Sequence, residues 1–425
     1  MPRILMFAAA FAPACFSEGL VNSKLALAMK ESGWDLEVIS MVSDKATCYQ
    51  SGWLPPWLPL KPILHQVETR IAKERGWRFP NLALDVLATG HLVKGVHWSR
   101  LAYRKAIELQ TVKPFDLVIS RSTSCCSHLP AILFKKATGV QWVANWNDPP
   151  PYLFPPPYTH AMPKCRRLMV RRYLRAAARM ADYNTFPNRH LFLHLRIELG
   201  ITDEKRLRII PHIAFVGHKA IPWKRCDSLR LCHAGNLSAA RRPETFLRAF
   251  KRVAERYKGR VKMTFDIIGT EEVNLRTITH DLGLDENVCF HGTKSFLDTL
   301  DLIARADVAV LIEAPCDKGI FLPSKIIDYA QTGRPILSIS PKTGVMRDLL
   351  AELGGGIHAD NLSQPDIEVA LERIAQLWLK NRLDKLDPNR WVQEASVEAV
   401  LSAFKSMMPP SFATRRPVGI PNMNP

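Results

Sequence analysis

Short β-rich runs alternate with helical patterns along most of the chain, and this alternation constrains the fold more than any other feature. In the first half the candidate strands are Ile4–Phe7, Leu36–Ser40, Phe115–Ser120, Gln141–Trp146 and Tyr183–Phe186. In the second half they are Leu229–His233, Lys262–Ile268, Asn287–His291, Ala306–Ile312, Pro335–Ser340 and Gly356–Ala359. Helical patterns of roughly 10–15 residues separate most of these runs, which predicts parallel sheets covered by helices on both faces.

The alternation pauses once, over residues 212–227, and then restarts. We interpret the pause as a linker between an N-terminal domain (1–218) and a C-terminal domain (219–390). A helix over 391–407 follows, and the proline-containing tail 408–425 is expected to be disordered. The predicted fold class is α/β, with two doubly wound Rossmann-like domains facing a cleft and the C-terminal helix returning to the first domain. Because ligands of such sheets bind beyond the carboxyl ends of the strands, we expect the site in this cleft.

Charge is distributed unevenly between the two predicted domains. The 425 residues include 58 Lys and Arg against 40 Asp and Glu. Residues 1–218 hold 29 of the basic and 15 of the acidic side chains, whereas the rest is nearly balanced at 29 and 25. The first domain is therefore expected to face something anionic: a membrane surface, a phosphorylated acceptor or nucleic acid. Nine cysteines without C-x-x-C or zinc spacing fit free thiols in a reducing, cytoplasmic compartment.

The apolar stretch Ile4–Phe16, which follows Arg3, has two interpretations. It imitates a signal peptide, or it is a buried strand, Ile4–Phe7, followed by a loop broken at Pro13. We favour the strand because a helical pattern follows at once and continues the series of strands and helices. No run of about 18 apolar residues predicts a membrane-spanning helix.

The loops that follow the first strand of each predicted domain contain candidate ligand contacts. Neither loop carries G-x-G-x-x-G, which argues against a dinucleotide-binding dehydrogenase. Gly19 lies where the backbone would approach a ligand before the first helix. In the second domain Gly235 and Asn236 follow a strand, and Arg241 stands just before a helix start, where a basic side chain suits phosphate. Taken alone, a glycine here is equally well a turn residue, and the arginine a solvated one.

The segment after the run Val308–Ile312 is the richest in candidate contacts. Pro323 and Ser324 precede a helical pattern, with Ser324 a candidate N-cap and Lys325 beside it. Asp328 lies one turn further on the same helix face, where its carboxylate could accept the hydroxyls of a ribose. A cation, a helix start and a carboxylate in one segment predict a nucleotide-diphosphate site.

These motifs, in this order, resemble those of retaining glycosyltransferases of GT-B fold, family 4. The stretch from Pro323 to Pro335 resembles the branch with a P-S-K turn, an acidic residue and A-x-G-x-P, within the family's E-x7-E region. Gly235-Asn236-Leu237 followed by Arg241 resembles its glycine loop, and Gln141–Pro149 resembles a strand end of the form W-x-x-D-F-R-D-P-W. The resemblance covers about residues 1–405.

The resemblance implies transfer of a sugar from a nucleotide-diphosphate sugar with retention of configuration, without a metal or other cofactor. Together with the loops described above, the candidate donor-binding residues are Gly19, Gly235, Asn236, Arg241, Pro323, Ser324, Lys325 and Asp328. Asp328 would hold the ribose, while Arg241 and Lys325 would stabilise the departing diphosphate. The chain departs from E-x7-E at both Glu positions: Ile320 stands at the first, and Asp328 stands at the second.

On the acceptor side we single out Asp148 and His128, as groups that could position or deprotonate a hydroxyl. His128 is also readily interpreted as a core histidine. The run Lys164–Arg175 interleaves cations with apolar residues, typical either of a helix lying on an anionic membrane or of a solvated helix face. Membrane contact would suit a lipid-linked or surface-polysaccharide acceptor on the cytoplasmic side of the cell membrane.

Three other functions fit parts of the sequence. A nucleotide-sugar epimerase of GT-B fold would use the same donor cleft without an acceptor. A catalytically silent partner subunit would explain Ile320 and also Asn236, which stands where the family often has a basic residue after the glycine. A nucleic-acid-binding protein would explain the positive charge, but no basic–aromatic signature of a nucleic-acid module occurs, so no nucleic-acid partner is expected.

Overall fold

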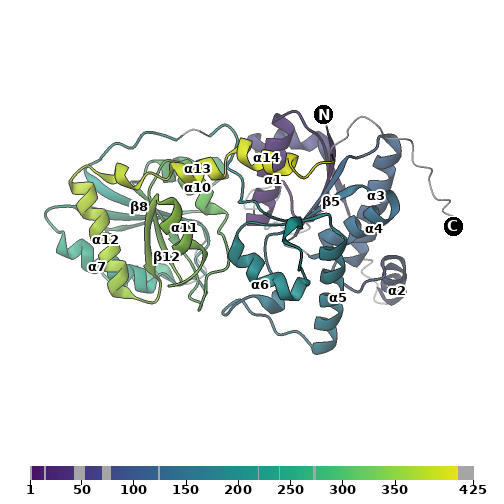
Figure 1. The fold of residues 1–425 in the computed structure, drawn as a ribbon. Coiled ribbons are helices and arrows are strands. Elements are labelled where there is room, and N and C mark those ends of the chain that lie inside the picture. Colours follow the sequence, from purple (N-terminus) through teal and green to yellow (C-terminus); the bar gives the residue numbers. More distant parts are fainter. Residues whose placement is uncertain are drawn as a thin grey trace.

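The computed structural model describes residues 2–13, 16–42, 53–68, 78–122, 125–218, 220–238, 240–270 and 274–409. They form two α/β domains, each built on its own parallel sheet (Figure 1). The two parallel sheets confirm the predicted α/β class with two doubly wound domains. The predicted tail 408–425 lies almost wholly outside the described residues.

The first domain contains a seven-stranded sheet in the order β3-β2-β1-β4-β5-β6-β7. Its strands are β1 (Arg3–Ala8), β2 (Asp35–Met41), β3 (Leu64–Val67), β4 (Leu117–Ser122), β5 (Gln141–Trp146), β6 (Tyr183–Phe186) and β7 (Leu207–Ile209). All neighbours pair in parallel. β1 pairs with both β2 and β4 and is buried along its whole length, as the strand interpretation of the N-terminal stretch predicted.

Helices cover both faces of this sheet. They are α1 (Ser17–Glu31), α2 (Arg78–Thr89), α3 (Val96–Val112), α4 (His128–Thr138), α5 (Lys164–Met180) and α6 (Arg189–Leu199). Alternate side chains of β1 point to opposite faces of the sheet. Leu5 and Phe7 pack in one apolar core cluster, and Ile4 and Met6 pack in another. This division follows from the two-residue period of a strand and explains why β1 is apolar on both sides.

The second domain contains a six-stranded parallel sheet in the order β10-β9-β8-β11-β12-β13. Its strands are β8 (Ser228–Ala234), β9 (Lys262–Ile268), β10 (Val288–Gly292), β11 (Val308–Ile312), β12 (Ile336–Ser340) and β13 (Gly356–Asp360). Its helices are α7 (Glu244–Arg256), α8 (Leu275–Asp281), α9 (Phe296–Ala304), α10 (Lys325–Gln331), α11 (Val345–Leu353) and α12 (Gln364–Leu379). The central strands β11 and β12 are fully buried.

The C-terminal segment returns to the first domain, as predicted (Figure 1). It forms two helices, α13 (Asn389–Glu394) and α14 (Val397–Lys405), where one was expected. The break occurs at Ser396, whose hydroxyl accepts a hydrogen bond from the amide of Ala399 at 3.2 Å and so begins a new helix. Val400 and Phe404 of α14 pack into the first domain's core.

Several contacts join the domains directly. The Lys24 ammonium of α1 lies 2.7 Å from the Asp328 carboxylate of α10. The Asn188 side-chain amide donates to the carbonyl of Ile320 at 3.1 Å. His212 Nε2 lies 3.2 Å from the carbonyl of Leu322. The loop that precedes α10 is therefore held against the first domain. Within the described ranges, no helix combines the length and apolar character that crossing a membrane requires.

Candidate functional site

A glycine turn at the end of β8 forms one wall of the candidate donor site. Gly235 has φ +128°, a region that side chains rarely adopt, and its amide donates to the carbonyl of Ile268 at 2.8 Å. A Cβ at this position would lie 2.1 Å from Lys325 Nζ. Gly269, at the end of β9, packs as closely, because its Cβ would lie 2.5 Å from the Gly235 carbonyl oxygen. Only glycine therefore lets the Lys325 side chain approach the end of β8.

Lys325 is the first residue of α10, and its ammonium points back to the carboxyl end of β8. Its Nζ donates to the carbonyl of Ala234 at 2.7 Å. The Tyr329 hydroxyl donates to the same carbonyl at 2.9 Å and orients it. Burial, and next the neighbouring Arg241 cation, lower the pKa of Lys325 to about 7, although Glu313 and Asp328 oppose the shift. Lys325 is thus a desolvated cation next to another cation.

Glu313 is a residue of this site that sequence reasoning missed. It follows β11 directly, at the same sheet edge as Gly235. Burial raises the pKa of its carboxyl to about 7, in spite of Arg241 and Lys325, which lower it. The available signal was its position, because the residue after a buried parallel strand lies where ligands of such sheets bind.

Arg241 extends the site toward the first domain. Its guanidinium carbon lies 5.9 Å from the centroid of the Tyr158 ring. Tyr158 follows a proline-rich stretch after β5, and its ring lies edge-on to Phe321 with centroids 6.3 Å apart. Phe154 of that stretch stacks on Phe321 at 5.5 Å. Burial raises the pKa of the Tyr158 hydroxyl above its usual range, although Arg241 acts against the shift. Side chains of the first domain thus cover the approach to Arg241.

Asp328 lies in the same site but already has a partner. Its carboxylate lies 2.7 Å from Lys24 Nζ, and the Lys24 side chain is 1% exposed. The predicted ribose ligand therefore forms an ion pair between the domains. Ile320, which stands at the first Glu position of E-x7-E, also contacts the first domain, because its side chain is buried in that domain's apolar core.

The remaining predicted donor residues lie around the same loops. Ser324 occupies the N-cap position of α10, but its side chain makes no capping hydrogen bond, contrary to the expectation. Pro323 is half-buried beside it, and its carbonyl accepts from the amide of Ile326 at 3.0 Å. The Asn236 side-chain oxygen accepts from the amide of Thr270 at 3.4 Å and so braces the loop after β9.

The acceptor-side residues lie at the carboxyl ends of the first sheet. Asp148 is half-buried, two residues beyond β5. Its neighbour Asn147 donates to Glu18 at 2.8 Å in the first turn of α1, where Gly19 is buried. Burial lowers the pKa of Arg121 to about 10, and Glu18 opposes this shift. Polar groups are thus concentrated at the end of β5 and the start of α1.

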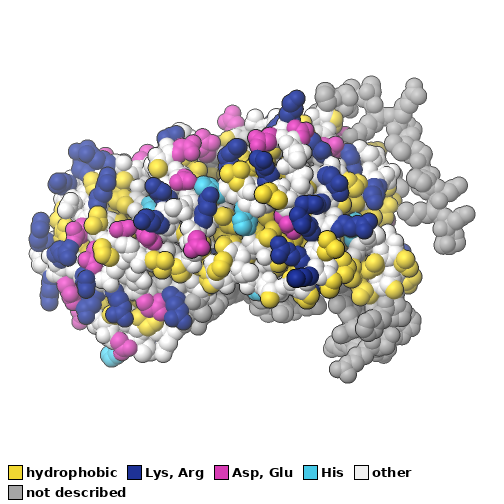
Figure 2. Space-filling view, turned by 60° about the horizontal axis from the view of Figure 1, so that its bottom comes forward, with side chains coloured by type: hydrophobic (Ala, Val, Ile, Leu, Met, Phe, Trp, Pro, Cys, Tyr) yellow, Lys and Arg dark blue, Asp and Glu magenta, His cyan; other side chains and the backbone are white. Residues whose placement is uncertain are grey.

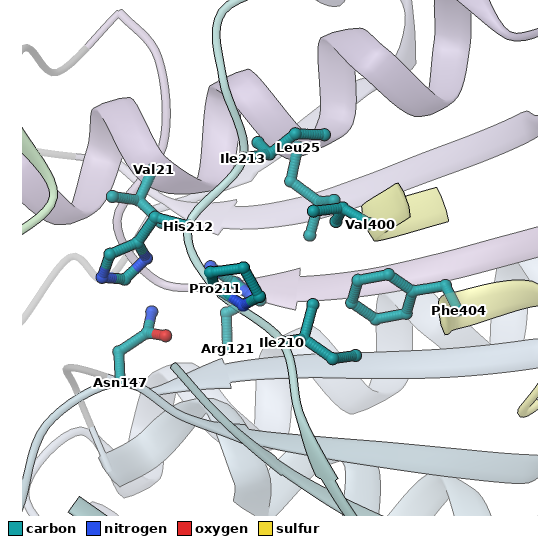
Figure 3. A pocket seen from close by; sticks show the side chains of 10 residues that line it. All are labelled: Val21, Leu25, Arg121, Asn147, Ile210, Pro211, His212, Ile213, Val400 and Phe404. Carbon is teal, nitrogen blue, oxygen red and sulfur yellow. The ribbon is translucent and has the colours of Figure 1, made fainter. Parts of the chain in front are cut away.

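A small pocket adjoins these residues. Its volume is about 10 Å³, enough for a single water molecule. Figure 3 shows Asn147 and His212 facing each other at one end, and Val400 and Phe404 of α14 at the other. The pocket is too small for a sugar, so it is not the acceptor site.

His128 does not join the other predicted site residues. Its side chain is fully buried, and its Nδ1 lies 2.7 Å from the Ser120 hydroxyl. Its ring packs on Trp146, with centroids 4.3 Å apart. Burial lowers the pKa of His128 to about 3, so the ring is neutral at physiological pH. The structure thus corrects the acceptor-side interpretation of His128 and gives it a place in the core, because its helix turns it onto the sheet and away from the cleft.

Comparison with known proteins finds likeness only at the level of structure. No family model matches the chain, and no curated protein matches it. A glycosyltransferase from Rickettsia africae ESF-5 is 12% identical, with a TM-score of 0.62 over 96% of this chain and 98% of that one. The lipopolysaccharide outer core galactosyltransferase WaaB is 14% identical, with a TM-score of 0.59 over 96% and 99%.

A third solved structure resembles the chain over a similar extent. It is an alpha-glucosyltransferase in complex with UDP and a 13-mer DNA, 12% identical, with a TM-score of 0.56 over 96% of this chain and 99% of that one. Each of the three alignments covers 96% of this chain, so each includes residues of both domains. The chain therefore has the GT-B fold, the two-domain architecture of these glycosyltransferases.

Proposed function

We propose that this protein transfers a sugar from a nucleotide-diphosphate sugar to an acceptor hydroxyl, with retention at the anomeric carbon. The observation that carries the proposal is the pair of cations, Lys325 and Arg241, beside the Gly235 turn. The fold supports the same chemistry, because its known structural neighbours include glycosyltransferases.

The electrostatics of the site favour a doubly charged anion. Arg241 lowers the pKa of Lys325, which means that the two cations repel each other across the site. Glu313, with a pKa of about 7, offsets this repulsion only in part. A diphosphate would supply the missing negative charge, and a perturbed cluster of this kind is typical of functional sites.

Transfer breaks the bond between the sugar's anomeric carbon and the β-phosphate oxygen, which keeps the electron pair. For retention, the acceptor oxygen forms the new bond to that carbon on the face from which the diphosphate departs, and it loses its proton, which we assign to the Asp148 carboxylate. Lys325 and Arg241 stabilise the charge that develops on the diphosphate, so removing either cation costs about 10²–10³ in rate. Replacing Asp148 by Asn costs about 10²–10⁴ in rate and leaves donor affinity unchanged.

Helix α5 supports a membrane-linked acceptor. Its first turns are exposed, and Leu168 and Met169, exposed by 67% and 42%, lie among Arg166, Arg167 and Arg172. On the face drawn in Figure 2, Lys and Arg are otherwise spread over both domains with Asp and Glu among them. We propose that α5 rests on anionic lipid at the cytoplasmic face and brings the site to a lipid-linked or surface-polysaccharide acceptor. Charge reversal at Arg166 and Arg167 should abolish binding to anionic vesicles, whereas reversal of exposed Arg248 on α7 should not.

The transfer proposal is tested with the full chain, a panel of UDP-, GDP- and ADP-sugars, and bacterial lipid extract as the source of acceptor. The measurement is the release of nucleoside diphosphate together with sugar incorporation, and the anomeric coupling of the product reports retention or inversion. We expect release with one donor type, greatly reduced in Lys325→Ala and Arg241→Ala.

Arg242→Ala is the matched control, because Arg242 lies next to Arg241 in the same loop but is exposed and pairs with Glu244 at 3.9 Å. It should transfer at the wild-type rate. Equal release by wild type and Lys325→Ala would contradict the assignment of the donor site, and an inverted product would contradict retention alone.

A further inference from the structure

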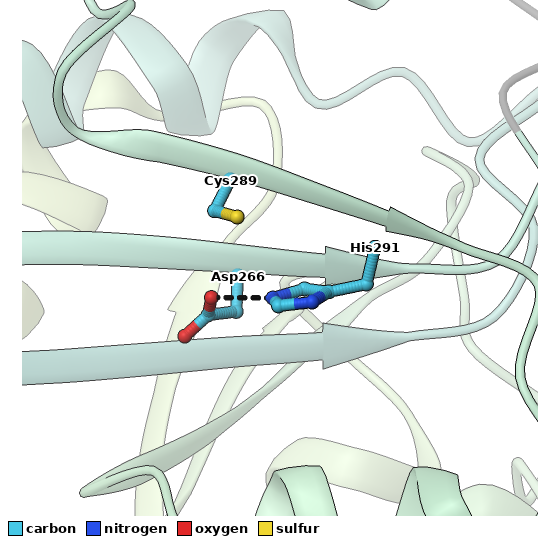
Figure 4. A group of neighbouring side chains, drawn as sticks. All are labelled: Asp266, Cys289 and His291. Carbon is cyan, nitrogen blue, oxygen red and sulfur yellow. Dashed lines mark hydrogen bonds and ion pairs between the residues drawn. The ribbon is translucent and has the colours of Figure 1, made fainter.

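Three side chains of different metal-ligating types meet on β9 and β10, away from the donor residues. Asp266 of β9 and Cys289 of β10 are partners in the parallel register. His291 lies two residues beyond Cys289, and its imidazole reaches the Asp266 carboxylate. One ligating atom from each residue lies within 4.8 Å of the other two (Figure 4). We propose that Asp266, Cys289 and His291 bind a transition-metal cation, with Zn²⁺ the best match.

The ligand set selects this class of ion. Zn²⁺ binds thiolate sulfur, imidazole nitrogen and carboxylate oxygen, and tetrahedral coordination places such atoms about 3.3–3.6 Å apart. His291 Nε2 lies 2.7 Å from Asp266 Oδ1, so this hydrogen bond would have to open by somewhat less than about 1 Å for both atoms to bind one ion. The thiolate disfavours Mg²⁺ and Ca²⁺, which take oxygen ligands. Three protein ligands leave a fourth position for water.

The surroundings of the cluster keep it accessible and oriented. β10 is an edge strand, and Cys289 is exposed while Asp266 and His291 are half-buried. The Arg230 guanidinium lies 3.8 Å from Asp266 Oδ2, the oxygen that does not contact His291. Arg230 therefore attracts the oxygen of Asp266 that faces away from the imidazole. The pairing of β10 with β9 shifts register between Phe290 and Gly292, and such an irregularity re-aims the side chain of His291.

The site has a structural consequence for the neighbouring donor loop. Just beyond the cluster, the Gly269 amide donates to the Gly292 carbonyl at 2.9 Å, and Gly269 packs under the Gly235 carbonyl. A bound ion would fasten β9 to β10 immediately before these glycines. None of the three ligands belongs to the donor residues, so metal binding can be measured without reference to glycosyl transfer.

The test uses the full-length chain, freed of metal with a chelator and titrated with Co²⁺ and then Zn²⁺. We expect one equivalent of Co²⁺ per chain with the charge-transfer absorption of a cobalt–thiolate bond, which Zn²⁺ displaces. Cys289→Ser and Cys289→Ala should lose this absorption. His291→Ala and Asp266→Asn should weaken binding by at least about tenfold. Circular dichroism establishes that each variant is folded.

Two matched controls separate the cluster from other surface groups. Cys165→Ser removes an exposed thiol on α5. His280→Ala breaks a different His–Asp pair of the second domain, which is exposed and has 3.0 Å between His280 and Asp285. Both should bind Co²⁺ like the wild type. The proposal is overturned if excess Co²⁺ and Zn²⁺ do not bind, or if Cys289→Ser keeps the thiolate absorption. Donor release, measured separately, reports on the transferase proposal and not on this one.

Discussion

The ion pair between Lys24 and Asp328 gives a sharp test of how the domains are held together. The two atoms lie 2.7 Å apart, and the side chains are 1% and 13% exposed. Asp328→Asn leaves a buried ammonium without a countercharge, and breaking a buried pair in this way costs about 3–5 kcal/mol. Lys24→Met removes the buried charge itself, and Asp328 keeps access to water. This variant should therefore lose less, about 1–3 kcal/mol.

The double variant distinguishes a true pair from two independent sites. Because Lys24→Met also removes the uncompensated charge, Lys24→Met with Asp328→Asn should be more stable than Asp328→Asn alone. The assay is thermal unfolding by circular dichroism, with transitions of the two domains fitted separately. At about 2–4 °C per kcal/mol, Asp328→Asn should lower the affected midpoint by roughly 6–20 °C.

Nucleotide binding adds a second readout to the same variants. If the Asp328 carboxylate holds the ribose, Asp328→Asn should weaken nucleoside diphosphate binding. Lys24→Met frees that carboxylate, and so should bind the nucleotide as tightly as the wild type or tighter. The reasoning is refuted if Lys24→Met is the less stable single variant, or if the two losses in stability simply add.

Three further predictions concern the donor turn, pH and the core. Gly235→Ala should abolish nucleoside diphosphate binding in calorimetry, because the added Cβ displaces the Lys325 ammonium. The control is Gly259→Ala, where φ is also positive (+80°) but an added Cβ would have no atom within 4 Å. This control should bind the nucleotide normally and lose only the stability that backbone strain costs. The affinity for the diphosphate should rise as the pH falls from about 8 to 6, because protonation at a pKa of about 7 charges Lys325 and neutralises Glu313. Calorimetry on the Lys325→Arg variant should find that its affinity depends less on pH. An unchanged pH profile in this variant would exclude Lys325 as the titrating group. The free energy of unfolding should fall as the pH drops from 6.5 toward 3. The pKa of buried His128 is about 3 in the folded protein, so over this range the imidazole binds a proton only in the unfolded chain. Denaturant titrations should show a smaller fall for the His128→Gln variant.

The regular part of the fold could be predicted because burial leaves a strong pattern. β1 and β11 are buried on both faces and read as continuous apolar runs. The edge strands β3 and β7 escaped prediction because they have four and three residues and are partly exposed. A strand of that kind has neither an apolar run nor a clear alternation. The start of α14 at Ser396 was missed because the apolar pattern continues across the break.

The candidate site could be predicted where the chain supplies neighbouring residues. Lys325 and Asp328 belong to one helix, and Gly235 to one turn, so local spacing was sufficient. The partner of Asp328 comes from α1, more than half the chain away, and only the packing of the domains brings it there. His128 stands at the start of a helix that follows a strand, and the sequence therefore predicts that it faces the cleft. In the structure its ring packs on Trp146 instead. Asp266 and His291 likewise meet only through strand pairing.

The most direct test of the donor site is calorimetric titration of the full chain with UDP, GDP and ADP, and with the matching monophosphates. The account predicts that one diphosphate binds and that its monophosphate binds at least about tenfold more weakly, a difference of about 1.4 kcal/mol. The difference should disappear in Lys325→Ala, because the β-phosphate then loses its cation. Equal affinity for the diphosphate and the monophosphate in the wild type would contradict the central claim that Lys325 and Arg241 form a diphosphate site.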